Sequence, residues 1–251
     1  RVRFGVTGEE TMDSGLTAGY FLRFDVDTNA SGTGNGKADG NVNAHKTTLW
    51  VSGDFGKVLF GDSGSPLEES EDRIAYSTFS EDLDILGNGK WTGGGVRYES
   101  NVMNGLQVKV GVGNVNNSKS SAISSMGASV AYDTDAFGVT VSAGKDSEDN
   151  AKTAWGISAD TSFAGFKVGA NYAKHDETKG YGVAAKYSVS SATTVAMNYQ
   201  TSKVTDADRK KYVTASVNHD LGGNASVNAA YISRNDAAGK DALKLRYKVT
   251  F

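Results

Sequence analysis

Apolar and polar side chains alternate along most of this chain, and this alternation limits the fold more than any other feature of the sequence. The clearest case is the segment 241–251, in which Leu243, Leu245 and every second residue after them are apolar, with lysine, arginine or threonine between them. Successive side chains of a β-strand point to opposite faces, so a period of two residues predicts a strand with one apolar and one polar face. The chain is therefore expected to be all-β.

Similar segments recur throughout the sequence and are separated by residues that favour turns. Fifteen segments carry the pattern or a shorter version of it: 2–6, 18–26, 46–52, 57–61, 95–100, 106–112, 126–132, 139–143, 155–159, 166–172, 181–187, 195–199, 213–217, 227–231 and 241–251. Short turns alternate with longer polar loops, which predicts an up-and-down meander of hairpins with two unlike ends. No helical period, linker or change of composition interrupts the pattern, so residues 1–251 are expected to form a single domain.

The environment of the apolar faces decides the class of β protein. No apolar run approaches the ~20 residues that a membrane-spanning helix needs, but a closed β-barrel crosses a bilayer with strands of about 10 alternating residues. The polar faces are rich in Lys, Arg, Asn, Ser and Gly, as the lining of a water-filled lumen would be. Aromatic residues gather near strand ends, where interfacial rings lie in membrane barrels: Tyr132, Phe137, Phe163, Tyr172, Tyr187, Tyr199 and Tyr231. A transmembrane barrel is predicted, and a soluble β-rich binding or adhesion domain is the alternative.

The end of the chain and one long connection resemble those of general diffusion porins, most closely the alphaproteobacterial type. The terminal sequence LKLRYKVTF, which ends at Phe251, resembles the outer-membrane assembly signal of that superfamily, and the connection 62–94 falls where such porins carry their constriction loop. The resemblance implies a transmembrane antiparallel up-and-down β-barrel in the Gram-negative bacterial outer membrane. It also implies passive diffusion of small hydrophilic solutes and ions through a water-filled, charge-lined pore, in a homotrimer that is not an enzyme.

The number of strands is the one departure from this resemblance. An up-and-down barrel closes antiparallel only with an even number of strands, whereas fifteen are visible. If the sixteen strands of the family apply, Arg1 begins the second strand, the first strand is missing from this chain, and the long loop lies between strands five and six. A barrel of fourteen strands, in which one of the weaker segments is not a strand, is the alternative.

The expected constriction loop is strongly acidic, with only Arg73 and Lys90 as basic residues. Its carboxylates are expected to line the narrowest part of the pore: Asp62, Glu68, Glu69, Glu71, Asp72, Glu81, Asp82 and Asp84. Basic residues of the early strands and of the last strand, which are neighbours in a closed barrel, are expected to line the opposite wall: Arg1, Arg3, Arg23, Lys46, Lys244, Arg246 and Lys248. Opposite charges across a narrow channel create a transverse field. Because the carboxylates would lie at the narrowest level, a weak cation preference is predicted.

No cofactor is expected. The chain has no Cys and only three scattered His, which argues against a zinc site. Bound Ca²⁺ is the one open possibility, because this ion takes several oxygen ligands, and the candidate ligands are Glu68, Glu69, Glu71 and Asp72. The net charge of −3 argues against a nucleic-acid partner, so membrane lipid, small hydrophilic solutes and ions are the expected partners.

The run Gly61–Pro66, GDSGSP, resembles the nucleophile loop of chymotrypsin-like proteases. Such a mechanism needs a His and an Asp on an already built barrel, but only one histidine, His45, precedes Ser63. Gly, Ser, Asp and Pro are also the residues that turn a chain as it leaves a strand. We interpret the run as the turn that sends the long loop inward, and an outer-membrane barrel hydrolase that uses Ser63 is the alternative.

Overall fold

Fifteen antiparallel strands form one sheet, in which each strand pairs with the strands before and after it in the sequence. The structure is a computed structural model that describes residues 2–26, 42–77, 86, 94–113, 125–146, 153–205, 207–235 and 241–250, apart from the side chains of Asn43, His45 and Asp146. The all-β prediction is confirmed. So are the fifteen strands, and the alternative of fourteen is wrong.

The strands match the predicted segments and extend most of them by a few residues. Their bounds are β1 Val2–Thr11, β2 Thr17–Val26, β3 Val42–Gly53, β4 Gly56–Gly61, β5 Gly95–Glu99, β6 Leu106–Gly113, β7 Ser125–Asp133, β8 Phe137–Asp146, β9 Thr153–Phe163, β10 Phe166–His175, β11 Thr178–Ser188, β12 Thr193–Lys203, β13 Lys210–Gly222, β14 Ala225–Arg234 and β15 Ala242–Val249. A short 3₁₀-helix, η1 (Pro66–Glu68), and a single-turn α-helix, α1 (Glu69–Asp72), follow β4. No helix among the described residues is long and apolar enough to cross a membrane.

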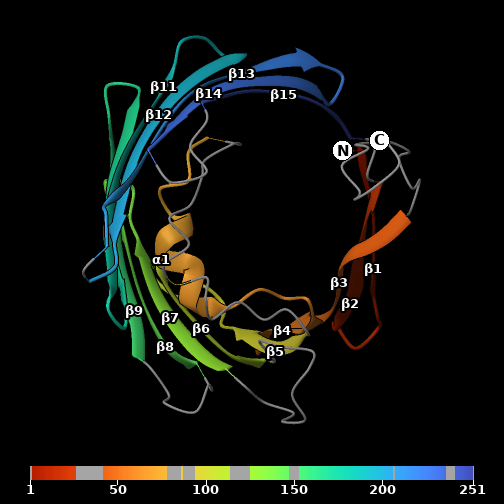
Figure 1. Ribbon diagram of the computed structural model, residues 1–251. Coiled ribbons are helices and arrows are strands. Elements are labelled where there is room, and N and C mark those ends of the chain that lie inside the picture. The colour runs from red at the N-terminus through yellow and green to blue at the C-terminus, as the bar shows by residue number, and fades with distance from the viewer. Residues whose placement is uncertain are drawn as a thin grey trace, which may run out of the picture.

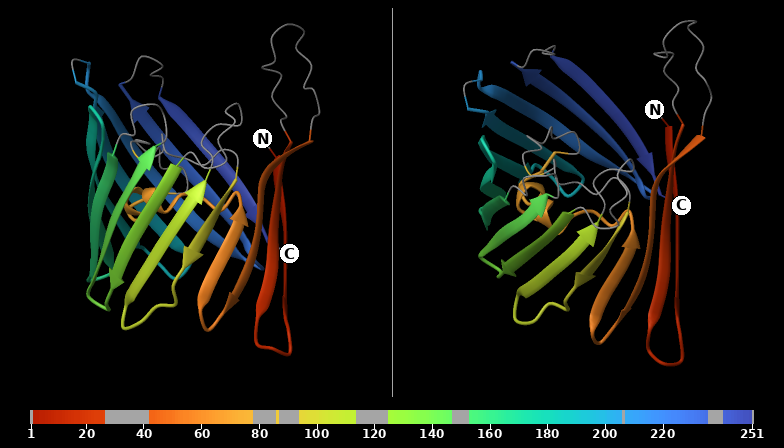
Figure 2. Two further views of the ribbon diagram at one scale, coloured as in Figure 1. Left: turned by 90° about the horizontal axis from the view of Figure 1, so that it is seen from below. Right: turned by 60° about the horizontal axis from the view of Figure 1, so that its bottom comes forward.

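Short turns join the strands at one end of the sheet, as Figure 2 shows for the turns between β1 and β2, β3 and β4, β5 and β6, and β7 and β8. The turn before β6 illustrates their chemistry: Asn104 and Gly105 both have positive φ, at 51° and 83°, and Met103 and Leu106 exchange backbone hydrogen bonds around them. Asn and Gly tolerate this left-handed backbone, and a two-residue turn of this kind matches the twist of the flanking strands. The local sequence thus specifies both the turn and the register of the hairpin.

The sheet exposes its apolar face and buries its polar one, the reverse of a soluble protein. On β9, Trp155 and Ile157 are 41% and 42% exposed, whereas Ser158 and Asp160 are 1% and 8% exposed. Aromatic rings stack on the exposed face at the short-turn end, where Phe166 lies between Phe163 and Tyr187 at centroid distances of 6.0 and 4.5 Å. Large apolar side chains are normally inside a soluble fold, so this outer face fits lipid contact.

The sheet curves around a central opening, with α1 inside it on one side and β1 to β3 on the other (Figure 1). Within the described residues, β1 pairs only with β2 and β15 only with β14. Fifteen alternating strands leave β1 and β15 running in the same direction, so an antiparallel closure requires a further strand between them. A total of sixteen strands stays a prediction.

Candidate pore constriction

The chain leaves the wall at the end of β4 and turns into the opening. Gly61 and Gly64 have positive φ, at 89° and 74°, and Asp62 N–H donates to the carbonyl of Thr47 at 2.7 Å. Ser65 then caps η1, because its hydroxyl accepts a hydrogen bond from Leu67 N–H at 3.2 Å, and Pro66 occupies the first turn. The GDSGSP run is therefore an inward turn followed by a helix start, as the sequence predicts.

Three of the largest fully buried apolar side chains lie between the inward-folded chain and the inner wall of the barrel. Leu67, Ile74 and Leu86 are at most 1% exposed, and Leu67 and Leu86 form a buried cluster with Ala154 of β9 and Ala173 of β10. The apolar core of the molecule is thus an interface between an inward segment and the wall. We call residues 62–77 the pore segment.

Glu69, the first residue of α1, holds the pore segment against β5 and β6. Its carboxylate lies 2.6 Å from Arg97 Nη2 and 2.6 Å from Lys109 Nζ. Arg97 also lies 2.8 Å from Glu99 and donates to the carbonyl of Ser63 at 3.3 Å. Charge-assisted contacts of this kind are stronger than neutral hydrogen bonds, so both carboxylate oxygens of Glu69 are engaged by the wall of β5 and β6.

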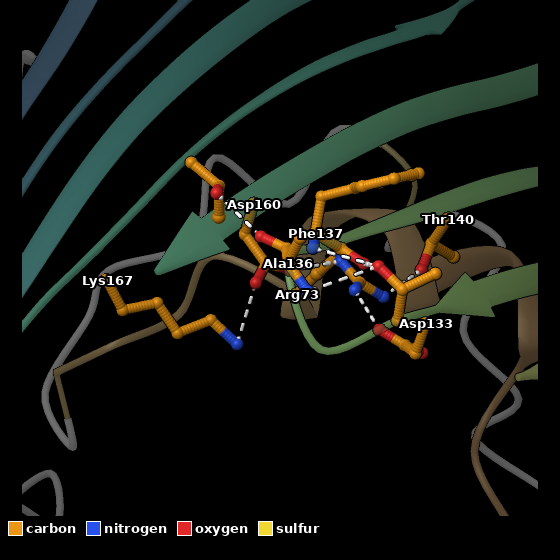
Figure 3. Close-up of polar contacts among 9 residues, drawn as sticks. Arg73, Asp133, Ala136, Phe137, Thr140, Asp160 and Lys167 are labelled. Carbon is orange, nitrogen blue, oxygen red and sulfur yellow. Dashed lines mark hydrogen bonds and ion pairs between the residues drawn. The ribbon is translucent and has the colours of Figure 1, made fainter. Parts of the chain in front are cut away.

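Arg73, directly after α1, holds the pore segment against β7, β8 and β9 (Figure 3). Its guanidinium forms ion pairs with Asp133 and Asp160 and donates to Thr140 Oγ1 at 2.8 Å. The second oxygen of Asp160 lies 2.8 Å from Lys167 Nζ. Burial by itself would lower the pKa of Arg73, but the hydrogen bond to Asp133 and the charge of Asp160 outweigh it and raise that pKa. The guanidinium therefore stays charged.

Further polar contacts connect the pore segment to the wall and to residue 86. Ser70 and Ser142 hydroxyls lie 2.6 Å apart, and Asn198 of β12 donates to the carbonyl of Ile74 at 2.8 Å. Glu71 accepts a hydrogen bond from Leu86 N–H at 3.1 Å. These contacts satisfy polar groups that would otherwise be buried without partners, so they fix the segment as well as attract it.

Tyr76 ends the described run at the wall of β10 and β11. Lys167 and Lys186 lie 5.8 and 5.3 Å from its ring centroid, within the range of cation–π attraction. Burial, followed by the charge of Asp160, raises the pKa of Tyr76 to about 12. The phenol is therefore neutral under ordinary conditions.

A basic wall lies across the opening from α1, on β1 to β3 (Figure 1). Arg3 lies 3.0 Å and Arg23 3.9 Å from the buried carboxylate of Asp25. Lys46 faces Arg23 directly in the register of β2 and β3. On β15 the basic residues alternate with the exposed apolar ones and so occupy the opposite face: Lys244, Arg246 and Lys248.

The predicted acidic residues divide into three groups. Glu69 and Glu71 contact the wall or the segment itself, as described above, whereas Asp72 is exposed on α1. Asp62 and Glu68 are half-buried on the same segment. The others, Glu81, Asp82 and Asp84, lie outside the described residues, as does Arg1. Among the residues that the structure describes, no group of three or more His, Asp or Glu could hold a metal ion, and calcium binding stays a prediction.

Sequence reasoning missed the wall residues that hold the pore segment. Arg97 and Lys109 lie on the polar faces of predicted strands, so their inward direction followed from the period-two pattern. Their pairing with Glu69 did not, because it depends on the path of the segment across the lumen. The same holds for Asp133 and Asp160, which meet Arg73 across gaps of many residues.

The hydrolase alternative requires a base next to Ser63. The Ser63 hydroxyl is buried and has no hydrogen-bond partner in the part of the chain that the structure describes. His219 instead pairs with Thr193 on the other side of the sheet, at 2.8 Å. Among the described side chains, the geometry thus offers Ser63 no proton acceptor, which a serine nucleophile needs.

The comparisons with known proteins agree with this geometry. The family model described as Gram-negative porin matches residues 1–237. The chain belongs to this family. The porin fold is also that of three solved structures: a porin refined at 1.8 Å resolution (TM-score 0.74, 22% identity, covering 100% of this chain and 92% of that one), OmpF of Salmonella typhi in complex with daunomycin (0.75, 15%, 94% and 84%) and a loop L8 deletion mutant of OmpT of Vibrio cholerae (0.70, 16%, 98% and 90%). No curated protein sequence matches the chain.

Membership of this porin family settles the general function. The chain is a β-barrel channel of the Gram-negative outer membrane, through which small hydrophilic solutes and ions pass by passive diffusion. The exposed apolar face of the sheet is its lipid contact, and the polar inner face lines the aqueous path. The interpretation as a soluble adhesion domain is not supported.

Proposed function

We propose that the pore segment is the constriction of this channel and that its carboxylates face the basic wall across the aqueous path. The observation that carries the proposal is the position of α1 inside the opening, away from β1 to β3 (Figure 1). The contacts of Glu69 and Arg73 support it, because they hold the start and the end of α1 at fixed places on the wall. A fixed obstacle of this kind sets the size of the solutes that pass.

The charges on the two sides give the constriction its selectivity. Charges in a narrow channel with low-dielectric walls are screened less than in bulk water, so opposed acidic and basic walls create a transverse field. Polar solutes align with this field, whereas apolar solutes would have to displace oriented water. Asp25 partly neutralises Arg3 and Arg23, and Arg97 with Lys109 neutralises Glu69. The remaining preference is weak and favours cations, since the exposed acid of α1 lies on the inserted segment.

Planar-bilayer recording tests this proposal. The purified protein is expected to show stepwise ohmic conductance and a cation-directed zero-current potential in a KCl gradient. Asp72→Asn should shift that potential towards anions, whereas Asp13→Asn, at an exposed turn outside the constriction, should leave it unchanged. Equal potentials for Asp72→Asn and the unaltered protein would contradict the placement of α1 charges on the ion path.

A second test addresses the acids outside the described residues. Neutralising Glu81, Asp82 and Asp84 together is expected to move the zero-current potential towards anions, because clusters of carboxylates favour cations. A triple variant with the original potential would show that these three side chains do not line the constriction.

We also propose that this porin has no enzymatic activity and assembles as a homotrimer. The Ser63 hydroxyl supports the first statement, since within the part of the chain that the structure describes no base accepts a hydrogen bond from it. The exposed apolar face of the first strands, where Val2, Phe4 and Val6 are 47 to 54% exposed, would be partly covered in an assembly. Ester cleavage that Ser63→Ala abolishes would refute the first statement, and a monomeric mass in mild detergent would refute the second.

A further inference from the structure

The inner wall under the pore segment lacks side chains at the places where the segment lies on it. Five inward-facing glycines, one on each of five successive strands, lie beneath the segment: Gly127 of β7, Gly144 of β8, Gly156 of β9, Gly169 of β10 and Gly182 of β11. We call these five residues the loop seat. None of them has a positive φ, so backbone conformation does not account for glycine at these positions.

Space accounts for them. A Cβ atom at Gly156 would come within 3.0 Å of Ser70 Oγ and lie 2.8 Å from Leu86 Cδ1. At Gly169 it would lie 2.7 Å from Tyr76 Oη and 2.8 Å from a methyl carbon of Ile74. Real Cβ atoms essentially never approach other atoms this closely, so alanine at either position would require these packed side chains to shift away from the wall.

The other three seat glycines contact the segment less tightly. A Cβ at Gly127 would lie 3.2 Å from both Leu67 N and Ser65 Oγ. At Gly144 and Gly182 the nearest segment atoms, from Leu67 and Ile74, would lie at 3.4 and 3.1 Å. The contacts follow the order of the residues in the segment and of the strands in the wall. Residues 65–67 lie over β7 and β8, residue 70 over β9, and residues 74–76 over β10 and β11.

Hydrogen bonds to the wall run along the same path, which is independent support for a single docked position. Ser70 meets Ser142 at 2.6 Å next to Gly156, which pairs with Ser142 in the register of β8 and β9. Asn198 reaches the carbonyl of Ile74 at 2.8 Å. The segment therefore packs directly on the wall at these glycines, where an added Cβ atom would contact it.

The geometry points to the loop seat as the determinant of pore width: the missing side chains of these wall glycines, far from the segment in sequence, set how far the segment projects into the channel. This inference rests on the proposed role of the segment as the constriction. It assigns positioning residues to the passive diffusion function, and it identifies the size of permeating solutes as the property that they control.

Single-channel conductance of Gly156→Ala tests the inference. Restoring an ordinary separation of about 3.5 Å requires the Ser70 and Leu86 side chains to shift by about 1 Å, and because both are fully buried we expect the segment to move with them into the lumen. The conductance should fall by roughly a tenth to a quarter, since a shift of that size narrows an opening several ångströms wide, and permeation of larger neutral sugars should fall more than that of K⁺. Gly127→Ala, with its longer contacts, should show a smaller decrease.

Ser70→Ala supplies the decisive comparison. The Cβ of Ser70 would lie 3.4 Å from a Cβ at residue 156, an ordinary contact, so removing the Ser70 hydroxyl relieves the closest contact and leaves only the one with the terminal methyl carbon of Leu86 at 2.8 Å. The double variant Gly156→Ala with Ser70→Ala should recover most of the lost conductance. Ser70→Ala alone also removes the hydrogen bond to Ser142, so it is measured as the baseline for the double variant.

Gly5→Ala is the matched control for the wall. Gly5 lies in β1, far from the segment, and its added Cβ would meet the mobile ring of Phe21 at 3.0 Å. Resistance of the unboiled protein to SDS verifies that each variant has folded. If a Gly156 variant does not fold, Gly127→Ala on β7 is measured alone, since Ser65→Ala would also remove the cap of η1.

Two outcomes would overturn the inference: an unchanged conductance in Gly156→Ala, or a decrease that Ser70→Ala does not reverse. Failure of the proposed constriction is distinguishable from both. In that case Asp72→Asn leaves ion selectivity unchanged, whereas a failed loop seat leaves the effect of Asp72→Asn intact.

Discussion

Replacement of Arg73 by methionine should release the pore segment from the wall that β7, β8 and β9 form. The guanidinium is 11% exposed and its partner Asp160 6% exposed, whereas Asp133 is 58% exposed. An exposed ion pair contributes at most about 1 kcal/mol, but breaking a buried pair costs about 3 to 5 kcal/mol, because it leaves an uncompensated buried charge. Lys167 still neutralises part of Asp160, so we expect the lower end, about 3 kcal/mol, lost from docking of the segment.

A loss of that size raises the undocked population about 100-fold, since each 1.4 kcal/mol is a factor of ten. Single-channel recording at constant voltage should show this as more frequent transitions to other conductance levels. Asp133→Asn, which removes only the exposed partner, should change the transition rate by less than about fivefold. Arg73→Met with Asp160→Asn should be quieter than Arg73→Met alone, because the orphaned carboxylate is gone. Recordings of Arg73→Met as quiet as those of the unaltered protein would refute the anchoring role.

Three further results are expected. Arg23→Ala with Arg246→Ala should move the zero-current potential further towards cations, and no movement would place both arginines off the ion path. The cation preference should fade as KCl rises from 0.1 to 1 M, because the Debye length falls from about 10 to about 3 Å; a preference that persists at 1 M would contradict a screened charge effect. Tyr76 has a folded pKa of about 12, raised from an ordinary value of about 10, so docking should be unaffected below the lower value and weaken as pH rises through the higher one. Tyr76→Phe should abolish that alkaline change, and its persistence would assign the change to another group.

The strands could be predicted because each one carries its own information. On β9, alternate residues from Ala154 to Asp160 face inward and are small or polar, while Trp155 and Ile157 face outward. Lipid outside and water inside impose this pattern on every strand separately, without reference to the rest of the fold. The turns are similarly local, as the Asn104–Gly105 pair shows.

The path of the pore segment could not be predicted, because it depends on residues distant in the sequence. Glu69 reads as a surface acid until Arg97 and Lys109 are placed beside it. The seat glycines read as ordinary strand residues with small side chains, and only the position of Ser70 and Leu86 above Gly156 shows what the missing Cβ allows. A charge count therefore identifies an acidic loop correctly but does not show which of its acids face water.

The short helix makes the same dependence visible from the other side. A helix of four residues, α1, cannot be stable by itself, since nucleation costs more than so few hydrogen bonds return. Its sequence, Glu-Ser-Glu-Asp, has no apolar stripe that would predict it. Neighbours on the wall hold it: the contacts of Glu69 at its first residue, those of Arg73 directly after it, and the closeness to β9 that Gly156 permits. The inner wall of the barrel thus both encloses the pore and specifies the conformation of the segment that narrows it.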